Sequence, residues 1–251
     1  MKKSKVILAL VCAVLLVCAS VLGTLAYLTS TDTVTNTFTV GQVKITLDEA
    51  KVDTDGKALT GNSAERVKEN SYKLFPGHVY DKDPTVTVLA GSEESFIKMT
   101  VTVNKCAELD KIFADHKITD LTTVVGGYDS TNWILQDVSK DATANTRTYT
   151  FYYKEKVSAT KADVALDDLF ETITVPGSLT NEEIETLQYK FTTVENADGT
   201  KTTTKTEDKL TITVKAYAIQ ADGFKDEVDA DGKTTKTAAQ AAWEAFDGKA
   251  S

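Results

Sequence analysis

Histidine, cysteine and proline are scarce in this 251-residue chain, which contains 2 His, 3 Cys and 3 Pro. With two histidines and no H-E-x-x-H segment, the chain lacks the paired imidazoles of a zinc protease. It also lacks a G-x-S-x-G nucleophile elbow, a glycine-rich phosphate loop and a dinucleotide fingerprint. We therefore predict that the protein is not an enzyme and that it needs no cofactor.

The residues that could still bind a metal or act as a nucleophile have simpler interpretations. His78 lies in a predicted turn, and His116 follows a predicted helix, where a cation suits the carbonyl dipoles. Cys106 is expected to be a buried packing residue. Two Asp-x-Asp-Gly segments, Asp53–Gly56 and Asp229–Gly232, lack the acid at the twelfth position of an EF-hand loop. We interpret both as turns, with weak calcium binding as the alternative, and predict no metal site.

Positive charge is in deficit, because 28 Lys and Arg stand against 37 Asp and Glu, a net charge of −9. A nucleic-acid backbone and an anionic membrane surface would both repel such a chain. We therefore expect neither as a partner.

The first 26 residues have the pattern of a secretory signal peptide. Three lysines precede the apolar run Val6–Leu22, and the small residues Thr24 and Ala26 are typical of a cleavage site. We predict cleavage between Ala26 and Tyr27 by a signal peptidase, which would leave residues 27–251 as a secreted protein with no membrane attachment. The alternative is a retained anchor, since the 17 apolar residues approach the length of a spanning helix.

Cleavage changes the composition of the remaining chain. Cys12 and Cys18 belong to the removed segment, so Cys106 alone remains and no internal disulfide can form. Without the three lysines of the segment, 25 basic residues face 37 acidic ones, a net charge of −12. The predicted product is thus acidic and free of disulfides.

Threonine makes up 38 of the 225 residues after Ala26, and β-branched residues favour extended backbone. In Thr33–Val40, threonines hold the odd positions while Val34, Phe38 and Val40 share the even face, which indicates a strand. Downstream, the apolar residues take odd positions, so Gly41 and Gln42 are expected to form a bulge, a bend or a break.

Alternating apolar residues predict further strands, and helical spacing predicts two short helices. The expected strands are 85–89, 96–103, 133–138 paired with 148–154, 172–175, 187–194 and 210–219, and the expected helices cover residues 106–113 and 239–246. Thr237 and Gln240 resemble a capping box at the second helix. Residues 48–70 are predicted to be a mobile loop, and Thr200–Thr206 an arm of a hairpin.

This order of elements has no βαβ alternation and no fixed repeat. We therefore predict a mostly β fold, an antiparallel β-sandwich of the jelly-roll type with short peripheral helices, formed by residues 27–251 as a single domain.

Three short segments resemble the TasA/camelysin family of secreted Gram-positive proteins. They are Gly23–Thr29 followed by Phe38–Gly41, Leu74–Gly77 leading to Asp81–Asp83, and Ala216–Phe224. The resemblance implies a jelly-roll sandwich, export through a dedicated signal peptidase and a place in the biofilm matrix or at the cell surface. For the fibre-forming members it implies self-assembly in which the N-terminal strand of one subunit completes a sheet of the next. Camelysin-like members are described as metalloproteases, but this chain has no H-E-x-x-H to carry that activity.

The sequence leads to one prediction of function and leaves alternatives open. We predict a secreted fibre subunit whose donor strand carries Val34, Phe38 and Val40. The first alternative is that this strand belongs to a monomeric sandwich, such as a surface adhesin or ligand-binding module that uses Trp133 or Tyr153. The second is a secreted metalloprotease. We expect the two aromatic residues to lie in the core.

Overall fold

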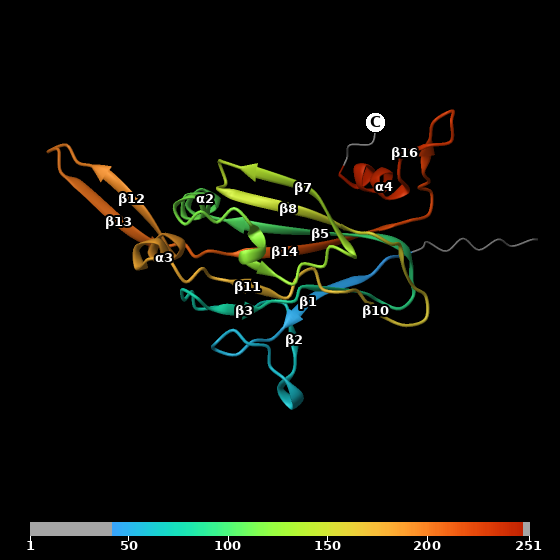
Figure 1. Cartoon of the computed structure of the whole chain (residues 1–251), viewed down its shortest axis with the longest axis horizontal. Coiled ribbons are helices and arrows are strands. Elements are labelled where there is room, and N and C mark those ends of the chain that lie inside the picture. Colours follow the sequence, from blue (N-terminus) through green and yellow to red (C-terminus); the bar gives the residue numbers. More distant parts are fainter. Residues whose placement is uncertain (1–41, 248–251) are drawn as a thin grey trace, which may run out of the picture. The chain divides into compact units, whose positions relative to one another are not determined.

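The computed structural model describes residues 42–247, and the predictions made for the signal segment and for Thr33–Val40 lie outside these residues. The described chain is mostly β, with antiparallel sheets and three short α-helices, as predicted (Figure 1). Among the described residues, no helix has both the length and the apolar character needed to cross a membrane.

The first sheet is built from short strands. Its order is β10 (Val164–Ala165), β4 (Thr85–Val88), β1 (Ile45–Ala50) and β2 (Arg66–Val67), and β3 (Val79–Asp81), β11 (Thr172–Thr174) and β6 (Val125–Gly126) form an adjoining set. Backbone hydrogen bonds from Lys82 to Glu171 and from Leu169 to Pro84 join the two sets. The strands β3 and β4 thus form one interrupted strand. It runs antiparallel to a second interrupted strand, which consists of β10 and β11.

The second sheet has longer strands. Its order is β14 (Ile212–Gln220), β5 (Ser92–Asn104), β8 (Thr146–Tyr153) and β7 (Trp133–Asp141), and β9 (Val157–Ala159) pairs with the start of β5. The hairpin predicted for residues 133–154 is confirmed by the β7–β8 register, which pairs Trp133 with Tyr153. The chain passes between the two sheets after β4, after β5, after β6, after β9 and again before β14, a crossing pattern that fits a jelly-roll type of sandwich.

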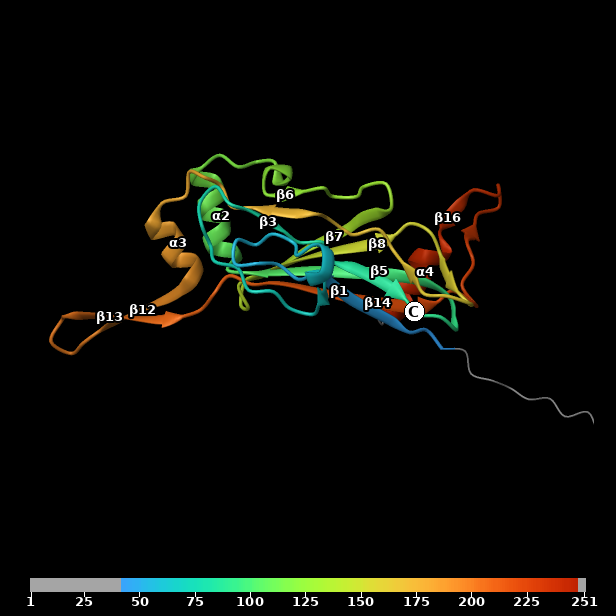
Figure 2. The same ribbon diagram turned by 90° about the horizontal axis from the view of Figure 1, so that it is seen from below.

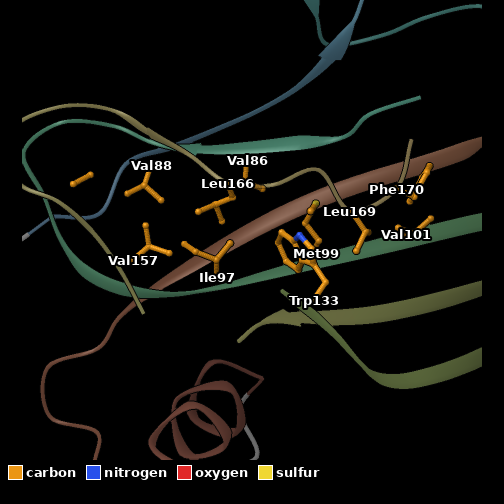
Figure 3. Close-up of a cluster of buried hydrophobic side chains, with 11 residues drawn as sticks. Val86, Val88, Ile97, Met99, Val101, Trp133, Val157, Leu166, Leu169 and Phe170 are labelled. Atoms are coloured by element: carbon orange, nitrogen blue, oxygen red, sulfur yellow. The ribbon is translucent and has the colours of Figure 1, made fainter. Parts of the chain in front are cut away.

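The core lies between the two sheets (Figure 3). Ile97, Met99 and Val101 alternate along β5 and point at Val86 and Val88 of β4, as period-two patterning requires. Trp133 of β7 is fully buried in the same cluster, and its Nε1 donates to the carbonyl of Asp167 at 3.0 Å. The prediction that this aromatic residue belongs to the core is therefore confirmed.

Short helices lie outside this core. Both predicted helices exist, as α2 (Cys106–Asp115) and α4 (Ala238–Phe246), and the capping box of Thr237 and Gln240 is present. Trp243 of α4 stacks on Tyr152 of β8 at 5.3 Å between ring centroids, so α4 covers the outer face of the second sheet. Two 3₁₀ turns, Gly61–Ser63 and Leu121–Thr123, complete the helical segments of residues 42–247.

One helix was not predicted from the sequence. Residues 181–188 form α3 (Asn181–Gln188), which begins at a capping box formed by Thr180 and Glu183. The strand expected at 187–194 is therefore shorter, and β12 (Tyr189–Glu195) starts only after Leu187 has packed into a second apolar cluster.

Two hairpins extend away from the sandwich (Figure 2). The first pairs β12 with β13 (Lys201–Glu207), which confirms the hairpin arm expected at Thr200–Thr206. The second pairs β15 (Glu227–Val228) with β16 (Thr234–Lys236).

The loop predicted at residues 48–70 is shorter than expected, because strands take up part of the range near both of its ends. This segment contains the end of β1, the turn Gly61–Ser63 and β2. Arg66 holds it in place, because its guanidinium binds the carboxylates of Asp48 and Asp83. These interactions span distant parts of the sequence, so the polar composition of the segment did not reveal them.

Candidate functional site

A cavity of about 1460 Å³ lies between the two sheets and opens to the surface. Much of its lining is apolar and comes from the inner faces of both sheets. Its lining includes Ile45 and Leu47 of β1, Val101 and Val103 of β5, Leu135 of β7, Tyr149 and Phe151 of β8, and Ile212 and Val214 of β14. Leu135 is 45% exposed although it lies on the same face as Phe151, its partner in the register. The described residues thus leave part of the inner surface of the sandwich uncovered.

The strand β14 forms one border of this opening. It pairs with β5 over nine residue pairs, from Ile212 with Val103 to Gln220 with Ser95. Its other edge has no strand partner within residues 42–247. Ile212 and Val214 point into the cavity. The alternate residues Thr213 and Lys215 are exposed. An unpaired edge of this length is a template for an additional strand.

The strand β1 forms a second border. Residues Ile45–Asp48 pair with β4 on one side, but on the other side β1 meets β2 only through Glu49 and Ala50. Its edge at Ile45 and Leu47 therefore has no strand partner in the described part of the chain, and the carbonyl of Leu47 accepts a hydrogen bond from Nζ of Lys68 instead. The edges of β1 and β14 lie near each other and border the same cavity. We call the part of the cavity that these two strands border, lined by Ile45, Leu47, Ile212 and Val214, the β1–β14 groove.

Charged side chains also line the cavity, among them Glu49, Lys82 and Arg147. Arg147 and Lys140 both bind Asp110 of α2, and the hydrogen bond from Lys140, followed by that from Arg147, lowers the pKa of this carboxyl. At the β1 end, burial, followed by the charge of Glu49, raises the pKa of the Tyr72 hydroxyl well above its ordinary value. The lining surface of the cavity is nevertheless mostly apolar, which favours an apolar occupant.

The aromatic residues considered for adhesion do not form a surface platform. Trp133 is fully buried, and Tyr153 is half-buried with its ring edge-on to Trp133 at 5.0 Å between centroids. The exposed apolar side chains of the described chain are spread over several elements, and they include Val138 of β7, Val194 of the β12–β13 hairpin and Val228 of β15.

The histidines and the cysteine have structural partners. His78 lies between the rings of Phe75 and Tyr80, at 5.6 and 5.4 Å between centroids. His116 is the C-cap of α2, and its Nε2 lies 2.9 Å from Oε1 of Glu183 on α3. Cys106 is buried at the start of α2. The predicted positions in a turn, at a helix end and in the interior are all confirmed.

Both Asp-x-Asp-Gly segments are turns. The carboxylate of Asp53 accepts from the backbone N–H groups of Asp55 and Lys57, and that of Asp229 accepts from Asp231 and Lys233 in the same way. These carboxylates are satisfied by their own loops. Within the described residues, no group of three or more His, Cys, Asp or Glu side chains is arranged to hold a metal ion.

The predicted donor residues Val34, Phe38 and Val40, and the predicted cleavage site at Ala26 and Tyr27, lie outside the described residues. The β1–β14 groove, by contrast, was not predicted. Alternation along 210–219 indicated a strand with one apolar face, but which of its edges is paired depends on contacts between distant segments.

Comparison of the chain with protein-family models, with curated proteins and with solved structures finds no match.

Proposed function

We propose that this protein is a secreted structural subunit that assembles head to tail, with the segment Thr31–Val40 of one copy adding as a strand in the β1–β14 groove of the next. The observation that carries the proposal is an open sandwich whose apolar interior is bordered by two strand edges that have no strand partner among residues 42–247. Assembly of this kind suits a fibre of the extracellular or biofilm matrix, in line with the resemblance to the TasA/camelysin family.

The volume of the cavity favours a peptide strand over a small molecule. Sites for small ligands measure about 300–1,000 Å³, and this cavity of about 1460 Å³ is larger and is bordered by exposed backbone. A strand satisfies both features at once, because its alternate side chains fill the groove while its backbone pairs with the free edge.

The apolar face of Thr31–Val40 is out of phase with the apolar face of β1. Ile45 and Leu47, at odd positions, pack against the core of the sandwich. In a straight continuation of β1, the even positions would face away from that core because side chains alternate. Val34, Phe38 and Val40 would then be exposed to water, so the bulge, bend or break expected at Gly41 and Gln42 must turn them toward an apolar groove.

A neighbouring copy supplies such a groove. Residues 42–44 are already bonded along the segment 89–93, since the carbonyls of Gln42 and Lys44 accept from Glu93 and Leu89. These hydrogen bonds extend the path of β1 back to Gln42, the first described residue. The leading segment therefore departs from the start of β1. When the leading segment enters the groove of another copy, the contact is head-to-tail, and it gives a filament if it does not close into a ring.

The energies explain why a free edge is needed as well as an apolar groove. Burial of Val34, Phe38 and Val40 contributes about 1.5–3 kcal/mol each. Ordering ten backbone residues costs about 1–2 kcal/mol per residue. Burial alone does not offset this cost, and the nine-residue edge of β14 adds the hydrogen bonds of a full ladder.

Electron microscopy of negatively stained protein tests the proposal. The chain 27–251 is expected to form fibres when concentrated, whereas the chain 41–251 is expected to stay folded, as judged by circular dichroism, and to form none. Phe38→Asp places a charge on the donated face and should abolish fibres, while the control Thr37→Asp, on the opposite face, should not. Fibres that persist without residues 27–40 would rule out strand donation.

A further inference from the structure

Two side chains from separate segments meet at the carboxylate of Glu49, near the end of β1. Nζ of Lys82, the residue after β3, donates to Oε2 of Glu49. Nδ2 of Asn70, from the segment between β2 and β3, donates to Oε1 of the same carboxylate at 2.9 Å. An amine and a carboxamide are thus held by the two oxygens of a single acid.

This cluster is shielded from water. Glu49 and Lys82 are each 8% exposed. The ring of Tyr72 covers the amine, with Nζ of Lys82 at 5.9 Å from the ring centroid. Burial of a charged pair costs free energy that its attraction often fails to offset, so a buried Lys–Glu pair is poorly explained by stability alone.

The carboxamide of Asn70 has a fixed orientation. Its Nδ2 also donates to the carbonyl of Ala50 at 2.8 Å, and its Oδ1 accepts from the backbone N–H of Val52 at 3.1 Å. The carbonyl is therefore polarised by a backbone donor, and the nitrogen that would leave faces the acid. This arrangement suits attack of an amine on the carbonyl carbon, because Val52 N–H can stabilise the negative charge that develops on Oδ1.

We propose that Lys82 and Asn70 become joined by an intramolecular isopeptide bond, with Glu49 carrying the proton. The ammonium group of Lys82 gives a proton to Glu49, and the neutral Nζ attacks Cγ of Asn70 to form the Nζ–Cγ bond. The Cγ–Nδ2 bond then breaks as Glu49 returns its proton to Nδ2. The leaving group, with its own two hydrogens and this proton, departs as ammonia. Nζ loses a second proton, which converts the ammonia to an ammonium ion, and keeps its third proton as the N–H of the new amide. An amine and a carboxamide thereby become a secondary amide, with no oxidant, metal or cofactor.

The isopeptide bond would be an internal covalent cross-link, which a single cysteine cannot provide. After the predicted cleavage Cys106 is the single cysteine, and it is buried. The new amide would join the segment that follows β2 to the residue between β3 and β4, within the first sheet. This inference stands on the Glu49 cluster and is independent of strand donation.

Mass spectrometry of the denatured, secreted protein tests the bond. Loss of ammonia makes the mass about 17 Da lower than that calculated from the sequence. Trypsin should then release Glu69–Lys73 covalently attached to Leu74–Lys98, with the bond at Lys82 uncleaved. Glu49→Gln removes the proton carrier and should return the protein to its own calculated mass, while the control Glu65→Gln should keep the deficit.

A second variant distinguishes the isopeptide bond from another reaction that releases ammonia, the cyclisation of Asn70 onto its own backbone. Lys82→Met should show its full calculated mass if Lys82 is the nucleophile, and should keep the deficit if Asn70 cyclises alone. A wild-type protein at its full calculated mass, with Glu69–Lys73 released as a free peptide, would overturn the proposal.

Discussion

Val214 of β14 and Val101 of β5 lie opposite each other in the sheet register, and both side chains line the cavity. The neighbouring Thr213 is exposed on the other face of the same strand. A single strand therefore offers one position inside the β1–β14 groove and one outside it, next to each other in sequence.

Val214 and Thr213 give a matched test of the groove. Val214→Arg places a long charged side chain in the groove and should prevent assembly, because an entering strand would have to bury the charge or leave it unpaired. Thr213→Arg on the outer face should leave assembly intact. Fibre yield by sedimentation measures both, and circular dichroism reports whether each variant is folded. Equal fibre yields from two folded variants would contradict the assignment of the groove.

The core between the sheets should depend strongly on Trp133. Truncation to alanine removes a fully buried ring and its hydrogen bond to Asp167, and we expect Trp133→Ala to lower the free energy of unfolding by about 3–5 kcal/mol. Val194→Ala, at an exposed position of the β12–β13 hairpin, should change it by less than about 0.5 kcal/mol. Urea denaturation measures both values. A loss at Trp133 similar to that at Val194 would contradict the proposed core.

The turn at Gly56 should tolerate no side chain. Gly56 has a φ of +73°, and a Cβ there would overlap the ring of Tyr80. Gly199 in the β12–β13 turn has a φ of +80°, but a Cβ there would meet no atom within 4 Å. Both alanine variants carry backbone strain, of about 1 kcal/mol. Gly56→Ala should cost clearly more, since the buried Tyr80 would have to move, and thermal unfolding would reveal a lower midpoint than for Gly199→Ala.

Acid should weaken the contact between α2 and the β7–β8 hairpin. Hydrogen bonds from Lys140 and Arg147 lower the pKa of Asp110 in the folded state. Because this folded-state pKa is depressed, the stabilisation is present above the ordinary pKa of about 4 and is lost as the pH falls below it. Asp110→Asn should therefore be less stable than the wild type at pH 7, and the two should converge in acid. Asp115→Asn, at the exposed end of the same helix, serves as the control. An unchanged difference at low pH would contradict this account of Asp110.

The strands were largely predictable because their alternation is local. Ile97, Met99 and Val101 alternate along β5, and Ile212 and Val214 continue the same pattern on β14. The helix α3 was missed because Leu187 was assigned to the strand that follows, although the Thr180–Glu183 spacing is the same capping signal that predicted α4. That helix could have been found from the sequence.

The groove and the Glu49 cluster could not have been predicted from the sequence. The groove depends on which edge of β14 pairs with β5, and the cluster brings together residues 49, 70 and 82 through the pairing of β1 with β2 and β4. Alternation shows which face of a strand is apolar, but it does not show which edge is left free.

Disulfide cross-linking between two copies tests the central claim most directly. If Val34, Phe38 and Val40 enter the groove, Thr35, Thr37 and Thr39 lie on the outer face, as do Thr213 and Lys215 of β14. With Cys106 replaced by alanine, copies carrying Thr37→Cys are mixed with copies carrying Thr213→Cys or Lys215→Cys and then oxidised. The account predicts a disulfide-linked heterodimer on a non-reducing gel. Cross-linking that occurs only when both cysteines are in the same chain, and gives a monomer, would show that the strand returns to its own subunit and would contradict the account.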